Sequence, residues 1–187
     1  MTRSRTDRAA RASVSVMDAT MLDDPIDVEV TSGPAPRTFT SFYEDRYTEI
    51  GRALAFTLGD TALAAEATDE AMARAFARWS TVQRYDNPSG WVYRVGLNWA
   101  RSVHRRAARR LPLRGRDEVV QPPVADPAIS RALGDLDVRL RAVVVCRCLL
   151  DWSVEETAHA LGIKSGTVKS RLHRALGLLE SALGHLR

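Results

Sequence analysis

The stretch Ser153–Leu172 reads SVEETAHALGIKSGTVKSRL and has the layout of a helix-turn-helix. Ser153 can cap a first helix, and Glu156, three residues later, completes a capping box. Gly162 supplies the positive φ that a tight turn needs. Ser165 is then placed to cap a second helix. The stretch therefore predicts two helices at an angle, joined by a glycine turn.

The second helix of this motif has an apolar and a basic side. Its apolar residues recur at helical spacing: Val168, Leu172, Leu176 and Leu179. If they pack inward, the residues turned outward or to the flank are Lys169, Ser170, His173 and Arg174. A helix presenting such groups can enter a DNA major groove. A helical hairpin that only packs is the alternative, but the two caps, the turn glycine and the basic second helix together favour DNA binding.

Length and charge agree with that interpretation. The chain has 187 residues, a formal net charge of +4 and a pI near 9.5, which suit one ordinary domain or two small ones with a nucleic-acid partner. The distribution of charge is more informative than its total. Residues 91–116 contain eight arginines and no carboxylate.

Several classes of protein are disfavoured. No apolar run reaches membrane-spanning length, and no apolar core follows the N-terminal arginines, so neither membrane insertion nor a secretory signal is expected. Cys146 and Cys148 stand two residues apart on an expected helix, which points them to different sides and disfavours a mutual disulfide. No set of metal ligands accompanies them. We expect a cytoplasmic protein with no catalytic residues, no metal and no cofactor.

A first helical module is expected over residues 38–106, after a disordered tail at 1–37. One amphipathic helix runs from Phe39 to near Gly59. A second runs from about Thr61 to Trp79, with an apolar stripe of Met72, Phe76 and Trp79. Asn87 is a plausible N-cap for a third helix, with Pro88 at its first position.

The third helix, expected to end near Arg106, has two opposed faces. Val92, Val95 and Trp99 mark the apolar one. The other face carries residues at spacings of four, three and four: Arg94, Asn98, Arg101 and Arg105. A merely solvated surface is the alternative, but such a surface usually mixes charge signs. Because arginine donates to phosphate bidentately, contact with a nucleic-acid backbone is favoured.

Prolines and low apolar content predict a flexible linker over residues 107–130. A second module then follows over residues 131–187. No strand-like alternation occurs, so the expected fold is all-α: two small helical domains joined by a linker.

Three segments resemble conserved regions of the bacterial sigma-70 family. Residues 64–79 resemble the helix that binds core RNA polymerase, and residues 87–102 resemble the adjoining promoter-melting segment. Residues 143–147, together with the helix-turn-helix, resemble the family's fourth conserved region. The first two segments correspond to region 2 of the family and the third to region 4. Because only these two regions are present, the nearest match is the extracytoplasmic-function (ECF) group. The fold expected from the resemblance is a region 2-like bundle followed by a region 4-like helix-turn-helix.

The resemblance implies a sigma factor that binds core RNA polymerase and directs it to the −10 and −35 elements of a promoter. The implied contacts on polymerase are the β′ clamp helices and the β flap. By this resemblance, the helix that faces the clamp helices carries Asp69, Glu70 and Arg74. Family members usually carry Gln where Asp69 stands. An anti-sigma factor is a further partner that the family allows.

The resemblance also assigns the two basic faces. Asn98 matches a position that helps to hold a flipped −10 base, and the residues that secure the adjacent backbone are Arg94, Arg101 and Arg105. The −35 surface comprises Lys169, Ser170, Arg171, His173 and Arg174. Two other functions remain open: a stand-alone helix-turn-helix repressor or activator, and, more distantly, a nucleic-acid-processing enzyme.

Overall fold

The computed structural model describes residues 38–110 and 127–184, which form helices and no strand. The all-α fold class is therefore confirmed. The tail expected over residues 1–37 and the central part of the expected linker lie outside the described residues. Within the described part of the chain, no helix is both long and apolar enough to cross a membrane.

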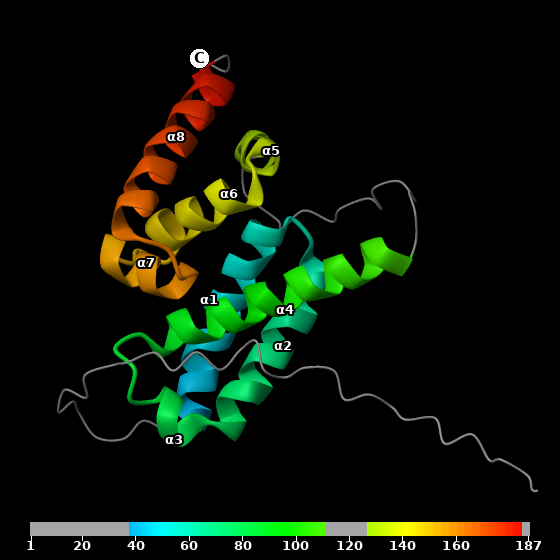
Figure 1. Cartoon of the computed structure of the whole chain (residues 1–187), viewed down its shortest axis with the longest axis vertical. Coiled ribbons are helices and arrows are strands. Elements are labelled where there is room, and N and C mark those ends of the chain that lie inside the picture. The colour runs from blue at the N-terminus through cyan, green and yellow to red at the C-terminus, as the bar shows by residue number, and fades with distance from the viewer. Residues whose placement is uncertain (1–37, 111–126, 185–187) are drawn as a thin grey trace, which may run out of the picture.

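The N-terminal module contains α1 (Phe39–Leu58), α2 (Thr61–Ala77), α3 (Trp79–Val82) and α4 (Pro88–Arg110) (Figure 1). Gly59 ends α1 in the left-handed region at φ 70°, and the Asp60 carboxylate caps α2 through the Leu63 N–H. Asn87 accepts a hydrogen bond from the Gly90 N–H at 2.7 Å, and Pro88 opens α4. The expected cap of this helix is confirmed.

The second helix differs from its expected form. It is interrupted at Arg78, and Phe76 is 67% exposed instead of sharing a buried stripe with Met72 and Trp79. Small residues form most of the buried stripe: Ala64, Ala67, Ala71 and Ala75. They allow α2 to lie close to α4, where a Cβ on Gly96 would come within 3.0 Å of the Ala67 carbonyl oxygen.

The C-terminal module contains α5 (Pro127–Asp135), α6 (Val138–Val144), the π-helix η2 (Val145–Leu149), α7 (Val154–Leu161) and α8 (Ser165–Leu183). The capping box of Ser153 and Glu156 is present, and Gly162 has a φ of 63°, which confirms both features. The expected cap at Ser165 is wrong. Lys164 stands at the N-cap position, Ser165 is the first helical residue, and no side chain caps α8.

The ends of the expected linker are helical. Helix α4 continues to Arg110, and α5 begins at Pro127. Residues 107–110 read AARR, which are good helix formers, while proline is well suited to a first helical position. The span without described structure is therefore residues 111–126.

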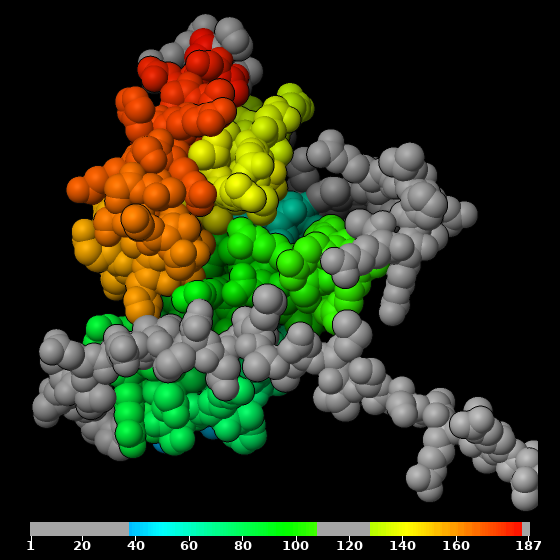
Figure 2. All heavy atoms as spheres, viewed as in Figure 1, coloured from blue at the N-terminus to red at the C-terminus, as the bar shows by residue number. Residues whose placement is uncertain are grey.

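The two modules share one apolar core. Residues of α1, α2 and α4 belong to the same cluster as residues of the C-terminal module: Ala142, Val145, Cys146, Leu150, Trp152 and Ala160. The space-filling view shows α7 directly against α4 (Figure 2), and α6 packs against α1. We call this the closed arrangement. It covers part of α4 with the helix-turn-helix.

Candidate nucleic-acid and polymerase interfaces

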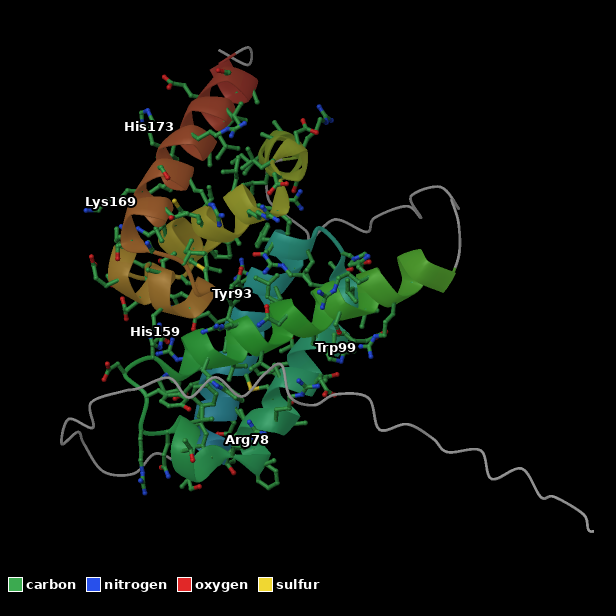
Figure 3. All side chains as sticks on the ribbon, in the orientation of Figure 1. Arg78, Tyr93, Trp99, His159, Lys169 and His173 are labelled. Atoms are coloured by element: carbon green, nitrogen blue, oxygen red, sulfur yellow. The ribbon has the colours of Figure 1, made fainter. Side chains whose placement is uncertain are left out.

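The outer face of α8 is basic and open to solvent. Val168 and Ala175 are buried beneath it, which fixes the orientation of the helix. Figure 3 shows Lys169 and His173 extending from α8 on the side away from α4. The exposed polar members of the expected −35 surface are Lys169, Ser170, His173 and Arg174. Leu176 was expected to pack inward but is 47% exposed, because Ala175 takes the buried position.

Arg171 lies differently from the other four residues of that set. It is half-buried and lines a cleft with Arg139 of α6 and Arg101 of α4. Its side chain therefore faces the N-terminal module, not the outer face of α8.

The basic face of α4 is largely covered. Arg94, Asn98 and Arg101 are half-buried, and only Arg105 is exposed. A guanidinium nitrogen of Arg94 lies 3.0 Å from the position that a Cβ on Gly162 would occupy. A side chain at position 162 is thus disfavoured for two reasons: the backbone is left-handed there, and Arg94 occupies the space of a Cβ. The turn of the helix-turn-helix sits on the face expected to bind the −10 element.

Arg101 on this face has a lowered pKa. Burial lowers its pKa below the usual value, and the neighbouring cations Arg139 and Arg171 lower it further. An arginine remains protonated under such a shift, so the result is a concentrated positive charge between the modules.

The residues expected to bind polymerase, Asp69, Glu70 and Arg74, lie together on one side of α2. Asp69 is exposed and accepts a hydrogen bond from the Tyr47 hydroxyl at 2.7 Å, which raises the pKa of Tyr47 to about 12. Glu70 and Arg74 form an ion pair at 2.7 Å, one turn apart. Phe76, farther along α2, is the most exposed large apolar residue in the part of the chain that the structure describes. The face therefore combines fixed charges with an exposed aromatic ring.

Comparisons with known proteins agree with this arrangement. Residues 127–179 match the family model described as Sigma-70, region 4. The chain is 31% identical over 151 residues to the RNA polymerase sigma-E factor of Streptomyces coelicolor, covering 78% of this chain and 85% of that one. It is 33% identical over 157 residues to the ECF RNA polymerase sigma factor SigM of Mycobacterium tuberculosis, covering 79% and 78%. The chain belongs to the ECF RNA polymerase sigma factors. It acts in transcription initiation.

Solved structures share the fold of this sigma factor. The sigma factor RpoE of Bartonella quintana, in complex with the anti-sigma factor NepR, has a TM-score of 0.63 at 20% identity and covers 79% of this chain and 99% of its own. CnrH, in complex with the cytosolic domain of CnrY, has a TM-score of 0.55 at 22% identity and covers 79% and 88%.

The contact between the modules of this sigma factor was not predicted from its sequence. Tyr93 is fully buried; its hydroxyl lies 2.6 Å from that of Thr57, and its ring meets Trp152 edge-on at 5.7 Å. Burial raises the pKa of Cys146, beside Tyr93, to about 12. Cys148 is exposed, and both cysteines are free. Tyr93 stands among the basic residues of α4, so nothing in the local pattern marks it as a contact between modules.

No three metal-ligating side chains come together in the described part of the chain. His159 is exposed on α7.

Proposed function

We propose that this sigma factor reads the −35 element through the outer face of α8. The observation that carries the proposal is the exposed set of Lys169, Ser170, His173 and Arg174 on α8, the second helix of the helix-turn-helix. Lys and Arg can donate to guanine or to phosphate, while Ser and His add adaptable hydrogen bonds. In this assignment Arg171 contributes to DNA binding only after the modules separate.

Core RNA polymerase is the partner of the N-terminal module in this proposal. The clamp helices of β′ would contact the face of α2 that carries Asp69, Glu70 and Arg74, while the C-terminal module meets the β flap. The ion pair of Glu70 and Arg74 is a surface pair of small net energy, so its value here lies in fixing two side chains for a partner. Exposed Phe76 supplies an aromatic anchor of the kind enriched in interfaces.

The −10 element is assigned to α4. Asn98 would hold a flipped base, with Arg94, Arg101 and Arg105 on the adjacent backbone. In the closed arrangement three of these four residues are half-buried, so engagement of the melted strand requires the modules to move apart. An anti-sigma factor that binds the closed arrangement would oppose that step. The protein itself carries out no chemistry and lends promoter specificity to polymerase.

The experiment is in-vitro transcription with core enzyme and genomic promoter fragments, followed by mapping of start sites. We expect initiation only when both the chain and core enzyme are present, and co-purification of the two. A gel shift with the chain alone separates this function from a repressor or activator. Tight, sequence-specific binding without polymerase, and no association with core enzyme, would overturn the proposal.

A further inference from the structure

A basic cleft lies where the two modules meet. It has a volume of about 150 Å³ and is lined by Arg101, Arg139, Ala142, Leu161, Ile163 and Arg171. It adjoins a wider hollow of about 490 Å³, because Arg139 and Arg171 line both. The wider hollow adds Arg174 and Ser170 from α8 and Asp137 from the start of α6. The cleft exists only while α4 and the C-terminal module are together.

Positive charge in this cleft is poorly compensated. Four arginines line the two hollows: Arg101, Arg139, Arg171 and Arg174. None of the four forms a salt bridge within the described ranges. The one carboxylate in the lining is that of Asp137, which caps α6 through the Arg139 backbone N–H at 2.8 Å and offsets only one of the four positive charges. Like charges brought together from two modules oppose the closed arrangement.

We propose that this cleft binds a free anion carrying a pyrophosphate group, either inorganic or as part of a nucleotide. Guanidinium groups match phosphate oxygens bidentately, and three helices present them around one space. The Ser170 hydroxyl adds a donor at the edge. Ala142, Leu161 and Ile163 form an apolar wall, which reduces screening by water on that side. The narrow part suits a small anion, and a DNA duplex is too wide to enter it.

Occupancy has two consequences. The anion neutralises the mutual repulsion of the arginines and thereby stabilises the closed arrangement. It also occupies Arg101 and Arg171, so it competes with promoter DNA; this second consequence rests on the proposed function.

The binding test needs neither polymerase nor promoter, so its failure is distinct from a failure of the proposed function. Inorganic pyrophosphate is titrated calorimetrically into the full chain at fixed ionic strength. We expect one site per chain, weakened at least about tenfold in Arg139→Gln, which removes one charge-assisted pair. Arg139 is exposed and lies outside the expected DNA-contact sets, so the variant should fold; its circular dichroism and melting temperature check this.

Arg131→Gln is the matched control, because Arg131 is an exposed arginine of α5 that does not line either hollow. It should bind pyrophosphate like the parent chain. Equal weakening in both variants, or no binding by the parent chain, would overturn the proposal. A short single-stranded oligonucleotide forms the second arm. If the oligonucleotide binds in an Arg139-dependent manner and pyrophosphate does not bind, the cleft recognises the phosphates of nucleic acid. The proposal of a free-anion site is then rejected.

Discussion

Helices α4 and α8 carry the same kind of surface but use it differently in the closed arrangement. Each has basic and amide or hydroxyl groups at helical spacing on the side opposite its apolar residues. On α8 this surface is open, with Lys169 and His173 extending into solvent. On α4 the turn at Gly162 lies against Arg94, and three of the four residues are half-buried.

The difference shows that a basic face defines a binding chemistry but not its availability. Whether such a face can bind depends on how much of it the other module covers. Here the contact between the two modules depends on Tyr93, Trp152 and Cys146. Because the proposed −35 surface is exposed and the proposed −10 surface is covered, we expect this sigma factor to bind polymerase before it melts DNA.

The largest effect is expected from removing the ring that joins the modules. Tyr93→Ala deletes a fully buried side chain and its contacts with Thr57 and Trp152, so the free energy of unfolding should fall by about 3–5 kcal/mol. Urea unfolding monitored by circular dichroism measures this. Tyr43→Ala, at a ring that is 39% exposed, is the control and should cost much less. Similar losses in the two variants would mean that Tyr93 does not anchor a shared core.

The open face of α8 is tested by Arg174→Ala. We expect −35-dependent initiation to weaken by about 1–3 kcal/mol, or roughly 5- to 150-fold, if the guanidinium contacts a base. If Arg174 contacts phosphate alone, the substitution should instead weaken initiation about equally at all promoters. It should also reduce the salt dependence of DNA binding. Binding to core enzyme should be unchanged, and its loss would place Arg174 in a different interface. Lys169→Ala should behave in the same way.

Alkaline pH should weaken the shared core through Cys146. Its pKa is raised from 9.0 to about 12, so the folded chain retains a proton that the unfolded chain loses above pH 9. Stability is therefore fully present below pH 9 and falls as pH rises, by about 1.4 kcal/mol between pH 8 and pH 10. The measurement is the difference between parent chain and Cys146→Ala in urea unfolding at both pH values. A difference that is independent of pH would show that the thiol is not sequestered.

The covered face of α4 is tested by Asn98→Ala. Loss of one hydrogen bond to a flipped base should reduce open-complex formation about fivefold, while closed-complex binding changes less. Permanganate footprinting and gel shifts separate the two stages. Equal loss at both stages would contradict the flipped-base assignment.

Local features of this fold were readable from the sequence, because they depend on neighbouring residues. The capping box at Ser153, the left-handed Gly162 and the Asn87 cap all follow from short-range chemistry. Features set by packing between distant residues were not. Met72 and Phe76 suggested an apolar stripe, whereas close helix packing selected the alanines of α2 and left Phe76 exposed.

The candidate site shows the same division. The sequence indicated which residues form the two basic faces. It gave no sign that Arg94 would lie against Gly162 or that Arg171 would face Arg101, since both contacts depend on how two modules meet.

The central claim is that the −10 face of this sigma factor is covered in the free chain and uncovered with polymerase. Alkylation of the two cysteines, read by mass spectrometry with and without core enzyme and promoter DNA, tests it most directly. Cys146 is buried in the shared core and Cys148 is exposed, so each chain contains its own reference. We predict that Cys146 is protected in the free chain and reacts faster in the promoter complex, while Cys148 reacts readily in both. Rapid reaction of Cys146 in the free chain, or equal protection in both states, would contradict the account.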